Sequence, residues 1–202
     1  MASASRHLNH SGNMKTTGRK PIQKANKQGE PNQYAIVKSP LGDLLLVAGN
    51  DALIGLYFAG HKHAPAANQT WERNDGHPIL RKAAKQLEEY FNGTRMTFSI
   101  PLRLQGANFQ EEIWRQIARI PYGAVTSYSD LAARAGAPQA IRAAGTATGR
   151  NPISIIIPCH RVLGKNGELC GFAGGLKRKR RLLKLEISNH PNHQGFATSE
   201  RF

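Results

Sequence analysis

The chain has 202 residues and carries 28 lysines and arginines against 13 acidic residues, a formal net charge of +15. It contains no run of about 18 apolar residues, and its polar, basic beginning lacks the apolar stretch of a secretory signal, so we expect neither a membrane span nor export. Two cysteines are too few for a disulfide framework or a cysteine-rich zinc site, so we expect a cytoplasmic protein with reduced thiols.

Charge and composition divide the chain into four segments. Residues 1–33, with six basic residues, one acidic residue and almost no apolar ones, are typical of a disordered basic arm. Residues 34–100 carry seven basic and six acidic residues, whereas residues 101–188 carry fourteen and five. Residues 189–202 we interpret as a disordered tail. Between residues 34 and 188 the cationic excess lies in the second half, which favours a polyanion-binding domain there, although solvated lysines would give the same count.

The first half is predicted to form a small α+β unit. Short apolar runs separated by turn residues predict strands over 34–38, 44–48 and 53–58, followed by a loop over 61–75. Pro78 begins a helix with one apolar face, and Asn92 and Gly93 end it. A fourth strand is predicted over 97–100.

The second half is predicted to be helical. Apolar residues recur at helical spacing from Phe109 to Ile117, and the next helix runs to Ala135 with Ser127 or Ser129 as its cap. A turn at 136–138 leads into a third helix over about 139–147, and two short helices joined in this way form a helix-turn-helix. A flexible loop over 171–175 precedes a last, basic helix over 176–187.

Small residues dominate the third of these helices. Arg142 stands among Ala140, Ala143, Ala144 and Gly145. A face of small residues allows close packing against another helix or close approach to a narrow polyanionic groove. An unpaired arginine is costly to bury, which favours the groove.

The sharpest chemical signal lies in residues 151–162. An apolar segment over 153–157 is broken by Pro158, which leaves Cys159 and His160 adjacent at its end. A thiol becomes a good nucleophile when a base or cation favours its thiolate, and His160 and Arg161 are candidates for these roles. A lone cysteine is more often a small core residue, and we interpret Cys170, which lacks an adjacent histidine, as a bystander.

With its flanking motifs, this segment resembles the active-site signature of the O6-alkylguanine-DNA alkyltransferases, also called methylated-DNA–protein-cysteine methyltransferases. The resemblance covers about residues 34–188, and the order and spacing of the motifs agree throughout. The motifs are Asn151 to Val162, Tyr128 in Val-Thr-Ser-Tyr-Ser, Arg142 in Ile-Arg-Ala-Ala-Gly, the loop Gly-Phe-Ala-Gly-Gly at 171–175 and Glu186 in Arg-Leu-Leu-Lys-Leu-Glu.

The resemblance implies an α+β fold with a small N-terminal α/β, RNase H-like domain over 34–100. A mostly helical, winged-helix-like DNA-binding domain over 101–188 follows it and carries the active site. The implied activity is DNA repair by irreversible, single-turnover transfer of an alkyl group from O6-alkylguanine to Cys159. The damaged base is flipped out through the minor groove. The implied partner is double-stranded DNA that contains alkylated guanine, bound by a monomer. Repair of O4-methylthymine and cooperative assembly on DNA stay open.

The resemblance also implies a role for each matching residue. Cys159 accepts the alkyl group, His160 takes the thiol proton through a water, Glu186 orients His160, and Asn151 braces the site. Tyr128 assists the flip and hydrogen-bonds the guanine, while Arg142 fills the gap that the base leaves. The helix enters the groove through Ala140, Ala143, Ala144 and Gly145, and the base pocket is formed by Tyr128, Val162, Phe172 and Ala173, with the backbone at 162 and 173 reading the base edges.

Two departures from the family pattern change these expectations. Phe172 stands where the family has a tyrosine, and Ala173 where some members have a serine, so a side-chain hydrogen bond is lost and the range of alkyl groups is open. Some members bind structural zinc through N-terminal cysteines and histidines. The first half of this chain has no cysteine, so we predict no zinc and no other cofactor.

Two other functions remain as alternatives. A damage sensor without chemistry would resemble the alkyltransferase-like proteins, which lack the acceptor cysteine that this chain has. A cysteine hydrolase would need contact between Cys159 and His160, which is awkward if neighbours on an extended segment point to opposite sides. The basic run over 177–181 either contacts phosphate or forms a solvated helix face.

Overall fold

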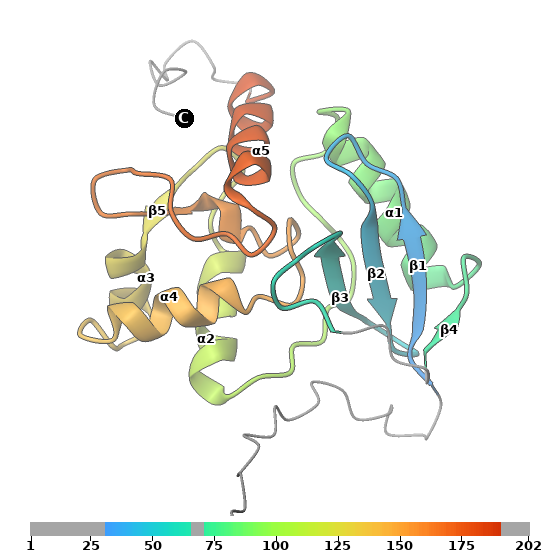
Figure 1. Cartoon of the computed structure of the whole chain (residues 1–202), viewed down its shortest axis with the longest axis horizontal. Helices are drawn as coiled ribbons and strands as arrows, with labels where there is room; N and C mark the ends of the chain where they lie inside the picture. Colours follow the sequence, from blue (N-terminus) through green and yellow to red (C-terminus); the bar gives the residue numbers. More distant parts are fainter. Residues whose placement is uncertain (1–30, 66–70, 191–202) are drawn as a thin grey trace, which may run out of the picture.

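A computed structural model of the chain describes residues 31–65 and 71–190. The predicted arm and tail lie almost entirely outside these described residues. The described part has mixed α/β content, with a sheet in its N-terminal half and mostly helices in its C-terminal half (Figure 1). None of the helices in this part is both long enough and apolar enough to cross a membrane.

The N-terminal half is a four-stranded sheet with one helix. Its strands are β1 (Gln33–Val37), β2 (Leu44–Ala48), β3 (Leu53–Phe58) and β4 (Glu72–Arg73), in the order β3-β2-β1-β4. The first three pair antiparallel, and β4 pairs parallel with β1. Helix α1 (Pro78–Phe91) packs against this sheet through Leu80, Ala83 and Leu87. Strands β1 to β3 and helix α1 agree with the predicted spans to within a residue or two.

The fourth strand, however, is not where the sequence predicts it. Residues 97–100 form no strand, and β4 lies instead in the segment predicted as a loop. The reason lies in α1, because Gln86 is buried there and its side-chain amide bonds both the backbone N–H and the hydroxyl of Ser99 at 2.9 Å. The side chain of Gln86 thus accepts the hydrogen bond from a backbone N–H group that would otherwise need a partner in a neighbouring strand.

The C-terminal half consists of helices α2 (Asn108–Ala118), α3 (Tyr128–Arg134), α4 (Ile141–Gly149) and α5 (Leu176–Ser188). Two short parallel strands, β5 (Thr126–Ser127) and β6 (Val162–Leu163), complete it. Ser127 caps α3 by accepting a bond from the backbone N–H of Asp130, and α3, a turn and α4 form the predicted helix-turn-helix. Helix α4 begins two residues later than predicted, at Ile141.

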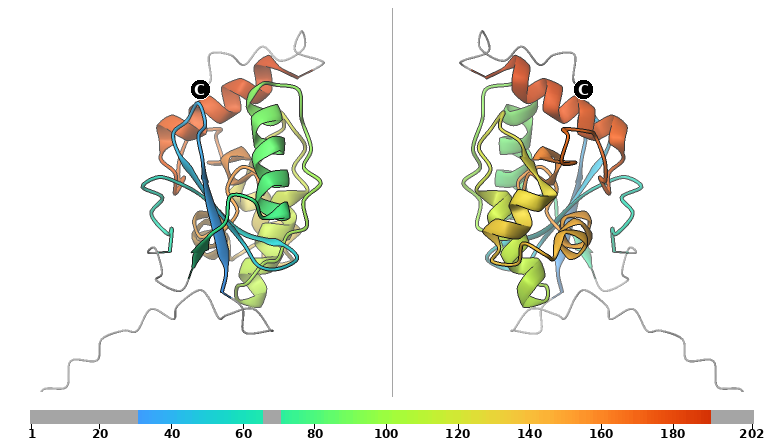
Figure 2. Two further views of the ribbon diagram at one scale, coloured as in Figure 1. Left: turned by 90° about the vertical axis from the view of Figure 1, so that its right-hand side faces the viewer. Right: turned by 90° about the vertical axis from the view of Figure 1, so that its left-hand side faces the viewer.

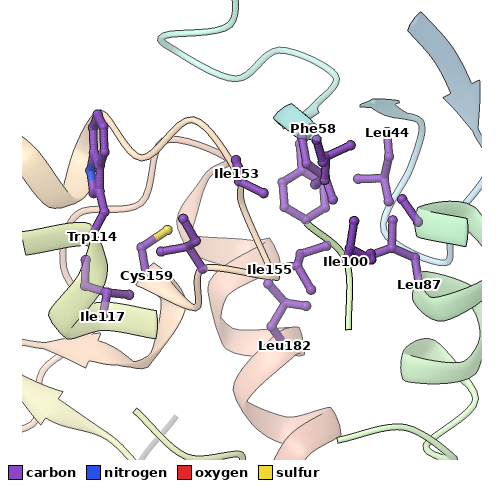
Figure 3. Packing of buried hydrophobic residues seen from close by; sticks show 14 of the residues in the cluster. Leu44, Phe58, Leu87, Ile100, Trp114, Ile117, Ile153, Ile155, Cys159 and Leu182 are labelled. Carbon is purple, nitrogen blue, oxygen red and sulfur yellow. The ribbon is translucent and has the colours of Figure 1, made fainter. Parts of the chain in front are cut away.

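One hydrophobic core runs through both halves. Figure 3 shows it extending from Trp114 and Ile117 of α2, past Cys159, Ile153 and Ile155, to Phe58, Leu44 and Leu87 in the sheet and α1. Leu56 of β3 forms a β-bridge with Ile153, which joins the two halves through their backbones. The two views of Figure 2 show α5 across one end of the molecule, where it meets both halves. The site described below is built at this junction.

Candidate active site

The segment that carries Cys159 is folded back on itself, contrary to the extended conformation we expected. Residues 154–156 form turns, and Cys159–Arg161 is one turn of 3-10 helix. Ile155 has a φ of 71°, a region that β-branched residues rarely adopt. Such strain costs about 1–3 kcal/mol and is typically maintained at functional sites. Here it directs Cys159 inward, to a position only 4% exposed.

Asn151 holds both the turn and the thiol. Its side-chain N–H group donates to the carbonyl of Ile157 at 2.8 Å and to Sγ of Cys159 at 3.1 Å. Its side-chain oxygen accepts from the backbone N–H of Ile153 at 3.0 Å. Asn151 is itself buried, so one amide fixes the start of the segment, its end and the sulfur.

The environment of the Cys159 thiol opposes ionisation at rest. Burial raises its pKa, while the bond from Asn151 and the charge of Lys179 act to lower it. Lys179 of α5 is fully buried, and its ammonium donates to the carbonyls of Val162 at 2.5 Å and Cys170 at 2.6 Å. Burial lowers the pKa of Lys179 to about 8. The resting site therefore holds a protonated thiol close to a buried cation.

His160 and Glu186 form a fully buried pair. His160 Nε2 lies 2.7 Å from Oε1 of Glu186, and neither side chain is exposed. Burial lowers the pKa of His160, and the charges of Arg161 and Lys179 lower it further, whereas the Glu186 carboxylate raises it. A neutral imidazole that donates from Nε2 to the carboxylate leaves Nδ1 as an acceptor. Nδ1 is buried and has no hydrogen-bond partner within the described part of the chain.

We expected Arg161 to favour the Cys159 thiolate, but the structure places its guanidinium elsewhere. Its guanidinium instead binds Glu186 through two bonds, at 2.8 and 2.9 Å, and donates to the carbonyl of Ile120 at 2.5 Å. Burial alone would raise the pKa of Glu186, but His160 and Arg161 together hold it well below its usual value. Arg161 therefore keeps the carboxylate charged, and Lys179 is the cation nearer the thiol.

Glu186 has two further donors that the sequence reasoning missed. The hydroxyl of Tyr90, in α1, donates to Oε1 at 2.8 Å, and the backbone N–H of Gly123 donates to Oε2 at 3.2 Å. Apolar periodicity predicts one core-facing side for this helix, and the ring of Tyr90 lies on it. Nothing in that pattern indicates that its hydroxyl reaches a carboxylate 96 residues away in the chain.

Tyr128, the first residue of α3, lies on the other side of the site. Its hydroxyl donates to the carbonyls of Cys170 and Gly171 at 3.2 and 3.3 Å, and its ring faces Gly145 of α4. Burial raises the pKa of Tyr128, and the neighbouring thiols of Cys170 and Cys159 raise it further. The phenol therefore stays protonated at neutral pH and remains a hydrogen-bond donor.

The small residues of α4 are divided between a packed face and an exposed one. Ala144 and Ala147 are buried against α2, where the indole N–H of Trp114 donates to the carbonyl of Ala147 at 2.8 Å. Arg142 and Ala143 are exposed on the other face, while Ala140 and Gly145 are half-buried. Ala144 therefore serves packing, and a groove-facing role remains open for the other predicted residues of α4.

The loop with the remaining predicted pocket residues is attached to the N-terminal half. Phe172 packs edge-on against Phe58 of β3, with ring centroids 6.1 Å apart, and the carbonyl of Ala173 accepts from the N–H of Lys62 at 3.0 Å. The N–H of Val162 donates to the carbonyl of Cys159, and its own carbonyl accepts from Lys179. Both backbone groups of Val162 therefore already take part in hydrogen bonds.

The basic run over 177–181 is not simply a solvated face. Lys179 is buried, and Arg178 donates to the carbonyls of Leu41, Ala59 and Gly174 at 2.9–3.0 Å. Lys177, Arg180 and Arg181 are exposed. The run therefore has two members with bonds inside the protein and three on the surface, which are free to contact a phosphate backbone.

The geometry combines a buried thiol, a neutral imidazole oriented by a carboxylate, and a phenol donor beside a helix-turn-helix. The 6-O-methylguanine DNA methyltransferase family matches in two parts, its ribonuclease-like domain over residues 32–104 and its DNA-binding domain over residues 108–188. The chain belongs to the 6-O-methylguanine DNA methyltransferase family. Its two-part architecture is that of the family, with a sheet domain followed by a helical DNA-binding domain.

Individual members of the 6-O-methylguanine DNA methyltransferase family resemble the chain over most of their length. A methylated-DNA–protein-cysteine methyltransferase of Haemophilus influenzae is 45% identical over 154 residues, which are 76% of this chain and 85% of that protein. One of Methanosarcina barkeri is 43% identical, over 77% of this chain and 98% of that protein. The crystal structure of Mycobacterium tuberculosis OGT in complex with DNA aligns with a TM-score of 0.73 at 40% identity, over 80% of this chain and 97% of that one.

Proposed function

We propose that this protein repairs double-stranded DNA containing O6-alkylguanine by transferring the alkyl group to its own Cys159. Family membership supports the reaction class, and the surroundings of Cys159 support the residue. The assignment rests on two contacts. Asn151 donates a hydrogen bond to Sγ of Cys159 at 3.1 Å, and His160, which follows Cys159 in the chain, contacts Glu186 at 2.7 Å. A core cysteine would need neither neighbour.

In the proposed reaction, Sγ attacks the alkyl carbon, the new S–C bond forms, and the C–O6 bond breaks with its electron pair staying on the guanine. The thiol proton passes to Nδ1 of His160 through a bridging water, because the thiol and the imidazole make no direct hydrogen bond in the described structure. Glu186 stabilises the imidazolium that results. Because the thiol is neutral at rest, its deprotonation accompanies the attack.

The protonated phenol of Tyr128 is suited to stabilise the leaving guanine by donating a hydrogen bond to it, in place of its present bonds to the loop carbonyls. Helix α4 would deliver the base, with Arg142 exposed on its outer face to replace the flipped nucleotide in the stack. The short β5–β6 pair beside α3 and α4 fits a winged-helix-like unit, and the sheet covered by α1 fits an RNase H-like one. Each protein acts as a monomer on one lesion.

The reaction ends with the protein spent. Water hydrolyses an acyl-enzyme by adding to its carbonyl carbon, but the saturated alkyl carbon of a thioether allows no such addition. The site is also closed, since Cys159 is only 4% exposed. We therefore expect a stoichiometric burst of one alkyl group per protein and no second turnover.

The test is to incubate the protein with a duplex containing O6-methylguanine and to map the modified peptide by mass spectrometry. We expect the peptide with Cys159 to gain about 14 mass units, because one methyl group replaces a proton and adds a net CH₂. Cys159→Ser should abolish transfer, and Cys170→Ser is the matched control that should leave it intact. Loss of the lesion without modification of Cys159 would refute the assignment.

The geometry disfavours the two alternatives. A cysteine hydrolase needs an imidazole in contact with its thiol, but the Nε2 atom of His160 is taken by Glu186 and its Nδ1 atom makes no bond to Cys159. A sensor without chemistry has no need of a thiol held by Asn151. Repeated turnover of an ester substrate would favour the hydrolase, and tight binding of damaged DNA without transfer would favour the sensor.

A further inference from the structure

Tyr90 connects the N-terminal half to the catalytic pair. It lies on α1 and is fully buried, and its hydroxyl donates to Oε1 of Glu186 at 2.8 Å. Oε1 is also the atom that His160 Nε2 contacts at 2.7 Å. Among the described residues, the other groups that bond Glu186 come from the C-terminal half, which leaves Tyr90 as the contribution of the sheet domain.

We propose that the Tyr90 hydroxyl is a positioning group for alkyl transfer, which fixes Oε1 of Glu186 and limits how strongly that oxygen binds the His160 imidazolium. The proposal rests on the proposed function, because it assigns a role within the same site. It makes the sheet domain a part of the proton-accepting apparatus.

The physical basis is competition for one carboxylate oxygen. Oε1 accepts from Tyr90, from His160 and from Arg161 at 2.9 Å, so its charge is shared among three donors. A bond to a charged acceptor contributes about 1.5–3 kcal/mol. If the phenol is removed, more of this charge acts on His160, the imidazolium becomes more stable, and the pKa of His160 rises.

Several other charged or titratable groups face the pair, and a variant at position 90 leaves them all in place. Arg161 faces it from the 3-10 turn, Lys179 from α5, and Tyr122 from the turn after α2. Cys159 precedes His160 in the chain. Because Tyr90→Phe removes one oxygen atom and changes no charge, any shift in proton affinity is traceable to the lost bond.

The ring of Tyr90 has a separate, purely structural role. It packs against the rings of Phe91, Phe98 and Tyr122 at centroid distances of 5.4, 5.6 and 6.1 Å. Phenylalanine keeps these contacts and loses only the hydroxyl. Tyr57→Phe is the matched control, because Tyr57 is a buried tyrosine of the same domain, 2% exposed, and makes no bond to Glu186 in the described structure.

The test measures single-turnover transfer from O6-methylguanine DNA to Cys159 between pH 5 and 9 for the wild type, Tyr90→Phe and Tyr57→Phe, alongside the melting temperature of each. For Tyr90→Phe we expect the acidic limb of the profile to move up by about 0.5–1 unit, so that the rate at a fixed pH on that limb falls about 3- to 10-fold. Tyr57→Phe should keep the wild-type profile. The same shift in both variants, or an unchanged profile in Tyr90→Phe, would overturn the proposal.

A second variant keeps the proposal testable if Tyr90→Phe fails to fold. Incorporation of 3-fluorotyrosine at position 90 alone retains the ring and the hydroxyl but makes the phenol a stronger donor, so the acidic limb should move down. Movement upward, or none, counts against the proposal. If the wild type itself transfers no methyl group to Cys159, the proposed function fails, whereas normal wild-type transfer with an unshifted variant refutes only the role of Tyr90.

Discussion

Asn151→Asp probes the site with almost no change in shape. The carboxylate keeps the acceptor for the N–H of Ile153 but replaces the donor that reaches the carbonyl of Ile157 and Sγ of Cys159, at 2.8 and 3.1 Å. An oxygen now faces an oxygen and a sulfur, and a negative charge stands where a thiolate must form. We expect the variant to fold less stably and to react far more slowly.

The magnitude follows from Coulomb's law. Two unit charges about 4 Å apart interact by about 4 kcal/mol at an effective dielectric constant of about 20, which corresponds to about three pKa units. Forming the thiolate of Cys159 beside Asp at position 151 should therefore slow transfer about a thousandfold at neutral pH. Two lost hydrogen bonds at a buried position should also lower the free energy of unfolding by about 2–5 kcal/mol.

The assay is single-turnover transfer from O6-methylguanine DNA, followed through the mass of the Cys159 peptide, together with urea unfolding. The defect should lessen as the pH is lowered, because protonation of the new carboxyl removes its charge and restores a donor. Asn166→Asp, at an exposed position, is the control for the effect of added negative charge on DNA binding. A rate for Asn151→Asp within threefold of the wild type, which is roughly 0.6 kcal/mol in activation free energy, would refute this account of the amide.

Three further outcomes follow from the described contacts. Arg142→Ala should slow repair of duplex DNA far more than transfer from the free base O6-benzylguanine, since only the duplex requires flipping; equal losses would contradict the role of this exposed residue. Replacing any of the exposed Lys177, Arg180 and Arg181 by alanine should reduce the log–log salt slope of DNA binding by about one unit if that residue contacts a phosphate, and an unchanged slope would exclude the contact. Because the pKa of Glu186 is lowered in the folded protein, its contribution to the free energy of unfolding is present above the unfolded pKa of about 4.3 and is lost as the pH falls below that value. Urea unfolding between pH 6 and 3 should therefore show a shallower loss of stability for Glu186→Gln than for the wild type.

Local patterns in the sequence predicted most of the secondary structure. Alternating apolar runs and turn residues placed β2 and β3 at their observed bounds, and Pro78 and Gly93 marked the ends of α1 correctly. The strand predicted over 97–100 was wrong because its backbone is bonded by a side chain, Gln86, from another element. No propensity of the segment itself carries that information.

The residues of the candidate site could be predicted, but not all of the contacts between them. The resemblance named Asn151, His160 and Glu186, and the structure places Asn151 against the Cys159 thiol and His160 against Glu186. Arg161 follows Cys159 by two residues, which suggested that its charge acts on the thiol. The 3-10 turn instead directs the guanidinium to Glu186. Which cation faces which anion depends on a conformation that the residue types at 153–158 do not specify.

Arg178 has a consequence for how the molecule folds. Its guanidinium joins the loop after β1, the loop after β3 and the loop before α5, and it lies 4.9 Å from the centre of the Phe58 ring. The carbonyls of Leu41 and Ala59 in the N-terminal half are thus bonded by an arginine of the C-terminal half, and the core runs without a break between the halves. The two family domains should therefore melt in a single cooperative transition, and a chain cut near residue 105 should recover neither stability nor a closed thiol site unless both pieces reassemble.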